Sequence, residues 1–345
     1  MKHCRLLVVG PSWVGDMVMA QSLFKSLKFD NPDLVIDVLA PEWSSPITER
    51  MPEVNKTIVS DLKHGEIGIS KRYNLAKRLK ENQYNQAIIL PRSIKSALIP
   101  WLASIPVRTG FKGEMRYRLI NDMRQLDPVI LNQTVKRFVA LGIEKDRVLP
   151  VINYPKLKVL ENNKSNIINR LDIDPGKPAI GILPGAEYGP AKRWPPNYFS
   201  QVIEEYLVKD WSVFILGSLK EQEISQDIYA QLLETEYPNL YDLTGHTSLL
   251  DAVDILSMMD IVLTNDSGLM HIAAAVGTPL VALYGPSSPD FTPPLTDNAK
   301  IIRKTTGYSK VRRGDAKGGY HPSLIALKPS EVLRELNILI EKSEK

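Results

Sequence analysis

Short, continuous apolar runs alternate along the chain with longer segments in which apolar residues recur at helical spacing. Three apolar runs in the first half, at residues 5–10, 34–39 and 86–90, predict strands that are covered on both faces, as in a parallel sheet. Between the first two runs, residues 16–28 carry apolar side chains at helical intervals. Residues 5–39 therefore predict a strand–helix–strand unit.

The same alternation returns in the second half of the chain. Four further apolar runs predict strands at residues 179–183, 211–216, 260–263 and 280–283. Helical spacing predicts helices at residues 196–209, 220–234, 249–258 and 268–276. Two successive sets of alternating strands and helices indicate an α/β protein with two doubly wound parallel sheets.

The boundary between the two sets is predicted by polar and turn-forming residues. A polar stretch at 153–169 is followed by turn chemistry at 174–178. We expect a first domain over residues 1–160, a second over 175–325, and a final segment at 326–345. That segment contains a predicted helix, and the sequence leaves open whether it crosses back to the first domain.

Composition excludes several classes of protein. The 345 residues carry a net charge of +4, which is too small to argue for a nucleic-acid partner. Cys4 is the only cysteine, which excludes an internal disulfide framework and fits a reducing compartment. No apolar run reaches the length of a membrane span or an export signal, so we expect a cytoplasmic protein.

The first candidate motif lies between the first predicted strand and helix, where Gly10 and Gly15 frame a short turn. A phosphate-binding loop of this spacing has Lys and then Ser or Thr, where this chain has Asp16 and Met17. A carboxylate there would repel phosphate, and Ser12 in place of glycine excludes a dinucleotide fingerprint. Asp16 is either a ligand-facing carboxylate at a strand end or a helix cap stabilised by about 0.3–1 kcal/mol.

Two loops of the second half are candidates for binding an anion. Residues 183–195 form a Gly- and Pro-rich loop with adjacent Lys192 and Arg193, which suits either a diphosphate or a solvated turn. In the second loop, Asp266 and Ser267 are natural helix caps at the start of a short helix.

Two further residues of that second loop bear on ligand binding. Gly268 would let a ligand approach the backbone, and the helix start offers a partial positive charge to a departing phosphate. His271 lies one turn further on, beside the candidate site, although a lone helical histidine is more often structural.

The sequence predicts no metal site and no cofactor. Asp172 and Asp174 have the DxD spacing of metal-dependent sugar transferases, but they precede a predicted strand, so we interpret them as a turn. No group of His, Cys, Asp or Glu has metal-ligand spacing. Ser218 follows a strand end without a G-x-S-x-G elbow, which makes a hydrolase a weak interpretation.

Two stretches are rich in cations. Between residues 92 and 124, seven cations stand against two acids, with aromatic residues interleaved: Arg92, Lys95, Arg108, Lys112, Arg116, Arg118 and Arg124. The simpler interpretation is a solvated face, and the functional one is a groove for an acidic, partly apolar substrate or a membrane surface. A second cationic segment runs from Arg303 to Lys317.

Taken together, these motifs resemble the ADP-heptose:lipopolysaccharide heptosyltransferases of glycosyltransferase family 9. The segments that carry the resemblance cover nearly the whole chain, in order: PSWVGDMVMAQSL (11–23), RMPEVN (50–55), GFKGEMRYRLIND (110–122), PGAEYGPAKRWP (184–195), TNDSGLMHIAAA (264–275) and LYGPSSPDFTPPL (283–295). The resemblance implies a GT-B fold, in which two Rossmann-like domains face each other across a cleft.

The resemblance also implies a reaction and its partners. The donor would be ADP-L-glycero-β-D-manno-heptose, and the acceptor would be the first heptose carried on phosphorylated Kdo2-lipid A. Transfer would invert the anomeric centre without a metal. The protein would also make a peripheral contact with the surface of the inner membrane. No nucleic-acid partner is expected.

Site residues follow from the resemblance by position. Asp16 would be the general base. The donor would be bound by Lys192, Glu187, Glu221, Thr247, Asp266, Ser267, Gly268 and His271. Acceptor contacts are expected from Ser12, Trp13, Gly15, Arg92, Lys95, Lys112 and Arg116. Glu187 and Tyr188 stand where a related heptosyltransferase has hydroxyl side chains, so individual contacts in that loop differ.

Three other functions remain open at this point. The enzyme could add a different heptose of the core, or it could be a nucleotide-sugar epimerase of the same architecture, which needs no acceptor. A module that only senses a nucleotide sugar is the third. The products formed with the donor alone, and with the acceptor present, separate all three from the proposed transfer.

Overall fold

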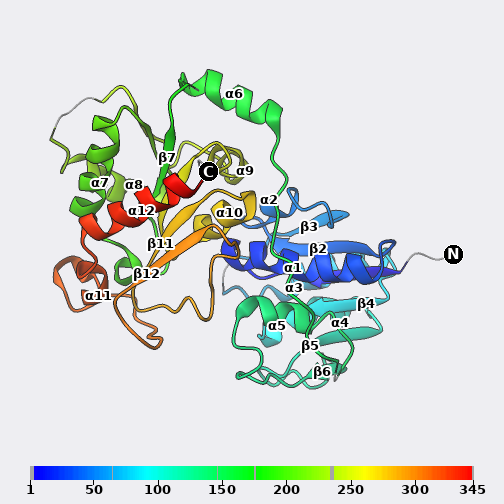
Figure 1. The fold of residues 1–345 in the computed structure, drawn as a ribbon. Helices are drawn as coiled ribbons and strands as arrows, with labels where there is room; N and C mark the ends of the chain where they lie inside the picture. The colour runs from blue at the N-terminus through cyan, green and yellow to red at the C-terminus, as the bar shows by residue number, and fades with distance from the viewer. Residues whose placement is uncertain (1–3, 64, 146, 175, 234–236, 344–345) are drawn as a thin grey trace. The chain divides into compact units, whose positions relative to one another are not determined.

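The computed structural model describes residues 4–343 except 64, 146, 175 and 234–236. The chain forms two compact units, the first ending at Lys156 and the second beginning at Leu157 (Figure 1). Each unit contains a six-stranded sheet whose strand pairs are parallel. The predicted α/β class with two Rossmann-like sheets is confirmed. Residues 175 and 234, which fall in predicted segments, lie outside the described residues.

The first unit alternates strands and helices around a central strand. Its elements are β1 (Arg5–Val9), α1 (Val14–Asp30), β2 (Val35–Pro41), α2 (Ser45–Thr48), β3 (Lys56–Ser60), α3 (Ile69–Lys80), β4 (Gln86–Ile89), α4 (Ile94–Leu102), β5 (Val107–Phe111), β6 (Asp122–Arg124) and α5 (Thr134–Ala140). The strand order is β3-β2-β1-β4-β5-β6. It reverses between β1 and β4, and ligands of such sheets bind at the carboxyl ends of the strands at this switch point.

The second unit repeats that plan. Its elements are α6 (Glu161–Leu171), β7 (Ala179–Leu183), η1 (Pro190–Lys192), α7 (Pro196–Val208), β8 (Ser212–Ile215), η2 (Leu219–Glu221), α8 (Gln222–Tyr229), β9 (Leu240–Asp242), α9 (Leu249–Leu256), β10 (Ile261–Asn265), α10 (Gly268–Val276), β11 (Leu280–Tyr284), β12 (Ala299–Arg303), η3 (Lys317–Gly319), α11 (Pro322–Ile325) and α12 (Pro329–Ser343). The order β12-β11-β10-β7-β8-β9 places its switch point between β7 and β10.

The last helix of the chain packs on the sheet of the second unit. Val332 and Leu336 of α12 are fully buried and belong to the hydrophobic core around Trp194. The indole N–H of Trp194 donates to the carbonyl oxygen of Leu327 at 3.0 Å, which fastens the segment just before α12. The sequence left open whether this last helix crosses back to the first domain. In the structure, the apolar face of α12 is buried in the core of the second unit.

The strands that the apolar runs did not predict lie at or near the sheet edges. They are β3, β5, β6, β9 and β12, and their sequences mix polar with apolar side chains because an outer strand is less completely covered. The polar stretch at 153–169, interpreted as a boundary, contains the first turns of α6. Ile167 is the one buried residue of that helix, and the rest of α6 is exposed or half-buried. The stretch therefore looks polar in sequence although it is helical.

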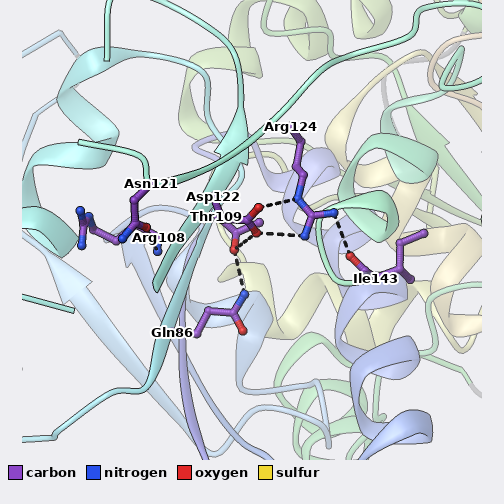
Figure 2. Close-up of polar contacts among 7 residues, drawn as sticks. All are labelled: Gln86, Arg108, Thr109, Asn121, Asp122, Arg124 and Ile143. Atoms are coloured by element: carbon purple, nitrogen blue, oxygen red, sulfur yellow. Dashed lines mark hydrogen bonds and ion pairs between the residues drawn. The ribbon is translucent and has the colours of Figure 1, made fainter. Parts of the chain in front are cut away.

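A polar network holds the short edge strand β6 (Figure 2). Gln86 of β4 donates to the Thr109 hydroxyl at 2.8 Å, and that hydroxyl donates to Asp122 at 2.9 Å. Arg124 donates to both oxygens of Asp122 at 2.9 Å and to the Ile143 carbonyl oxygen at 3.2 Å. Burial alone would raise the pKa of Asp122, but the hydrogen bonds from Arg124 and Thr109 outweigh it and hold the pKa below its ordinary value.

Replacing Asp122 by asparagine is expected to lower the free energy of unfolding by about 1–2 kcal/mol at neutral pH, because Arg124 loses its charged acceptor. A folded pKa below the unfolded value of about 4 means that this stabilisation is full above pH 4 and is lost as pH falls further. Urea unfolding of parent and D122N between pH 3 and pH 7 measures the difference. The exposed Asp33, changed to asparagine, is the matched control, and equal losses in both variants would contradict the role of the network.

The end of the first unit is tied to α1. Gln21 is fully buried, and its side-chain amide donates to the Lys156 carbonyl oxygen and accepts from the Lys156 N–H, both at 2.9 Å. The same amide donates to Glu53 at 2.9 Å, and Lys25 donates to the Tyr154 carbonyl oxygen at 2.6 Å. Glu53 belongs to the RMPEVN segment, so this part of the resemblance has a structural use in holding the end of the first unit against α1.

Candidate functional site

The first switch point presents Asp16 in the opening turn of α1. β1 ends at Val9, and Gly10 donates its N–H to the Leu39 carbonyl oxygen at 2.9 Å before the chain turns into the helix. Asp16 is half-buried at the third helical position, where the helix dipole stabilises a carboxylate. Because this position also lies at the carboxyl end of the central strand, where ligands of such sheets bind, Asp16 remains the candidate acid of the first unit.

The turn before Asp16 carries side chains of contrasting exposure. Trp13 is the N-cap of α1 and is 48% exposed, whereas Gly15 is buried. The indole N–H of Trp43, which follows β2, donates to the Ser12 carbonyl oxygen at 2.7 Å. Trp43 is 44% exposed, so two aromatic rings stand on this edge of the first sheet, and the sequence prediction had named one of them.

Three predicted acceptor cations follow β4 and β5, at the same edge. Arg92 and Lys112 are exposed, and the Arg92 guanidinium donates to the Lys112 carbonyl oxygen at 3.3 Å. Lys95, on α4, is half-buried and donates to the Gly65 carbonyl oxygen at 3.0 Å. Arg92 and Lys112 are thus brought together, whereas Lys95 is turned to a different loop.

Arg116 has a different place from the one predicted. It is 1% exposed, and its guanidinium donates to the carbonyl oxygens of Pro91 at 2.7 Å, Ser93 at 3.2 Å and Phe111 at 2.7 Å. A direct acceptor contact would require these hydrogen bonds to break. The structure instead makes Arg116 a clamp between the loops after β4 and β5, because a guanidinium can satisfy several carbonyl groups at once.

In the second unit, the two predicted anion-binding loops meet through an ion pair. Lys192 donates to Asp266 at 2.5 Å, and both side chains are largely buried. His271 is 5% exposed in the first turns of α10. Burial lowers the pKa of His271 to about 4, with Asp266 raising it and Lys192 lowering it further. His271 is therefore uncharged at neutral pH and can offer a hydrogen bond, but no positive charge.

The start of α10 has the general features of a helix N-terminus that can receive an anion. Ser267 is the N-cap and accepts from the Met270 N–H at 3.4 Å, and Gly268 opens the helix. Asn265, at the end of β10, accepts from the Trp194 N–H at 3.1 Å and donates to the Pro184 carbonyl oxygen at 2.7 Å. Sequence reasoning gave Asn265 no role, although it lies within the TNDSG run and holds the 184–195 loop at the switch point.

Glu221 lies at the carboxyl ends of β7 and β8. Its carboxylate accepts from the Ser218 N–H at 2.7 Å. A Cβ at Gly185 would lie 1.7 Å from a Glu221 oxygen, so only glycine lets the carboxylate occupy this place. A carboxylate here resembles the acid that binds a nucleotide ribose in other Rossmann-like sheets.

Glu187 and Thr247, the two remaining donor candidates, have no contact described with Lys192, Asp266 or His271. Glu187 is 57% exposed and pairs with Lys220 at 3.2 Å. Thr247 is half-buried in the loop between β9 and α9, just before the helix cap at Ser248. Lys192, Asp266 and His271 therefore form the core of the site, with Glu221 beside the same strand ends.

The described residues contain neither a candidate metal site nor a candidate membrane-spanning helix. Within residues 4–343, apart from the six undescribed positions, no three His, Cys, Asp or Glu side chains are grouped so that they could hold a metal ion. No helix in that part of the chain is long and apolar enough to span a bilayer.

Comparison with known families decides the class of protein. A sequence model described as glycosyltransferase family 9 (heptosyltransferase) matches residues 72–321. The chain belongs to glycosyltransferase family 9. It is therefore a glycosyltransferase, and the sequence-based prediction of family and enzyme class is confirmed.

Two relatives of this family 9 chain match it over nearly its full length. Lipopolysaccharide heptosyltransferase 2 of Escherichia coli K12 is 46% identical over 347 residues, which cover 99% of each chain. Lipooligosaccharide heptosyltransferase 2 of Haemophilus influenzae is 45% identical, over 98% of this chain and 99% of the relative. The solved structure of E. coli ADP-heptose LPS heptosyltransferase II matches with a TM-score of 0.90 at 44% identity, covering 99% of this chain and 100% of that one.

Proposed function

We propose that this chain transfers heptose from ADP-L-glycero-β-D-manno-heptose to the first heptose of heptosyl-Kdo2-lipid A in the lipopolysaccharide inner core. The observation that carries the proposal is the 46% identity to lipopolysaccharide heptosyltransferase 2 over 99% of both chains. The chemistry of the two switch points supports it, since one presents a carboxylate and the other an anion site with a lysine.

The transfer is a single displacement at the anomeric carbon. The acceptor hydroxyl oxygen forms a bond to that carbon while the bond between the carbon and the diphosphate oxygen breaks. Asp16 accepts the hydroxyl proton as general base, and the electron pair of the broken bond leaves with ADP. Because attack comes from the face opposite the diphosphate, the anomeric centre inverts through a transition state of oxocarbenium character.

Negative charge builds on ADP as it leaves. Lys192 and the N-terminus of α10, with Ser267 and Gly268, would stabilise that charge through groups that are already in place. Fixed positive groups of this kind take the part that a divalent cation plays in other sugar transferases, so the proposed reaction needs neither metal nor cofactor.

The nucleoside would be bound by the rest of the second edge. Glu221 would accept hydrogen bonds from the ribose hydroxyls, and Thr247 would lie near the adenine. His271, neutral at physiological pH, would donate to the diphosphate or the sugar. Glu187, in the loop at residues 183–195, would contact the donor from an exposed position.

The acceptor would be bound by the first unit. Ser12, Trp13 and Gly15 precede Asp16 and would contact the acceptor sugar. Lys95 and the pair Arg92 and Lys112 would bind the phosphates of the acceptor. The exposed aromatic residues nearby would, together with these cations, make a peripheral contact with the cytoplasmic face of the inner membrane.

Charge reversal at the acceptor cations should separate the two substrates. Arg92→Glu with Lys112→Glu is expected to raise the acceptor KM about tenfold or more, a loss of about 1.4 kcal/mol, and to leave ADP affinity unchanged. Lys77→Glu with Lys80→Glu on α3 changes the net charge equally at exposed positions away from the switch point. A defect confined to ADP binding, or an equal defect in both double variants, would place the acceptor elsewhere.

A mass-spectrometric transfer assay tests the proposed function itself. ADP-heptose is compared with other sugar nucleotides, and the acceptors carry no heptose, one heptose or two heptoses. We expect product with ADP-heptose and the one-heptose acceptor, at an unchanged rate in EDTA, with inverted anomeric configuration by NMR. Preference for another acceptor would indicate a different step, and an isomerised donor without acceptor would indicate an epimerase.

A further inference from the structure

The second cationic segment of the chain folds onto the loop that carries Lys192. The Arg312 carbonyl oxygen accepts from the Ala191 N–H at 3.2 Å. Gly189, at φ 137°, lies so close to this segment that a Cβ there would be 2.5 Å from the Arg312 carbonyl oxygen. Because any side chain at position 189 would collide with that backbone, the contact between the two loops depends on this glycine.

One aromatic ring in this contact is flanked by two cations. The Arg312 guanidinium carbon lies 5.3 Å from the centroid of the Tyr188 ring, and the Lys192 ammonium nitrogen lies 5.8 Å from it. Both distances are within the range of a cation–π interaction. Tyr188 thus restricts where the exposed Arg312 side chain can lie, and it contacts both Arg312 and Lys192.

The two cations differ in how their charge is balanced. Lys192 is paired with Asp266, so together they offer a bound anion little net charge. Arg312 is exposed, and no described carboxylate lies within ion-pair distance of its guanidinium. A diphosphate carries more than one negative charge, and the partial charge at the start of α10 balances only part of it.

We propose that Arg312 binds the diphosphate of the donor nucleotide as a second cation, with Tyr188 as the ring that holds its guanidinium beside Lys192. The proposal deepens the proposed function and rests on it, because it requires a nucleotide diphosphate at this edge of the second sheet. An arginine suits the task, since its planar guanidinium can donate two parallel hydrogen bonds to one phosphate.

Calorimetric titration with ADP and with adenosine tests the assignment. Arg312→Gln is expected to weaken ADP binding about tenfold and to leave adenosine binding, which involves no phosphate, unchanged. Arg313→Gln, at the adjacent exposed arginine, is the matched control and should bind ADP like the parent. Tyr188→Phe keeps the ring and should retain ADP affinity, whereas Tyr188→Leu should lose part of it. Thermal unfolding of each variant confirms that it is folded.

The contrary outcomes are distinct. If Arg312→Gln and Arg313→Gln bind ADP equally, Arg312 does not contact the diphosphate. If Arg312→Gln spares ADP but raises the acceptor KM, the phosphate that it meets belongs to the acceptor, and the donor assignment is wrong. In both of these cases, normal heptose transfer by the parent enzyme would leave the proposed function standing. A parent enzyme that binds no ADP would overturn the proposed function, and with it the role of Arg312.

Discussion

Replacing Asp16 by asparagine is expected to lower kcat by about 10²–10⁴, the contribution of a well-placed general base. Asparagine keeps the size and the hydrogen-bonding shape of aspartate but cannot accept the acceptor proton. The fold should survive, because the substitution keeps the shape of the side chain, and the helix-dipole contribution of a first-turn carboxylate is about 0.3–1 kcal/mol. ADP affinity should also be unchanged, since the proposed donor site is built from the second unit.

The same helix supplies the control for this substitution. Asp30 is the exposed last residue of α1, and Asp30→Asn makes the same chemical change at the other end of the dipole. Steady-state kinetics with saturating donor and acceptor should show full turnover for Asp30→Asn and a loss confined to Asp16→Asn. Turnover of Asp16→Asn within a factor of about two of the parent would refute the general-base role and leave Asp16 as a first-turn acid that interacts with the helix dipole.

The central parts of both sheets could be predicted from sequence because they are buried on both faces. β1 and β7, for example, consist almost entirely of apolar residues, and apolar runs are the signal of a covered parallel strand. The edge strand β3 has no such signal, because Lys56 and Val59 of KTIVS are exposed and Ser60 is its one buried residue. The strand order, and with it the two switch points, came only from the structure, since spacing along the chain does not say which strands pair.

Site residues could be predicted where a motif places them at a strand end, and less well where partners come from far along the chain. Lys192 and Asp266 were each singled out, but sequence does not show that they pair with each other. Arg116 was assigned to the acceptor because a cation in a basic stretch gives no sign of its burial. The carbonyl groups that hold Arg116 inside belong to loops whose proximity depends on the pairing of β4 with β5.

Replacing Lys192 by methionine is expected to reduce kcat/KM by about 10²–10³, comparable to the loss of one preorganised donor to a developing negative charge. Methionine keeps much of the apolar stem but removes the ammonium group. The effect has two sources, because Asp266 then remains as a largely buried carboxylate without its cation. That carboxylate would repel the diphosphate and would also lower the free energy of unfolding, by about 2–3 kcal/mol after allowance for the partial exposure of the pair.

A second substitution separates these two sources. In the double variant Lys192→Met with Asp266→Asn, the unpaired charge is gone, so most of the stability should return while ADP affinity stays well below that of the parent. Asp266→Asn alone should bind ADP at least as tightly as the parent, because it frees Lys192. Lys220→Met is the control for the loss of one positive charge, because Lys220 is exposed and forms an ion pair with the exposed Glu187. Recovery of full ADP affinity in the double variant would mean that Lys192 only neutralises Asp266, and leaving-group stabilisation would then have to come from the start of α10 and its neighbours.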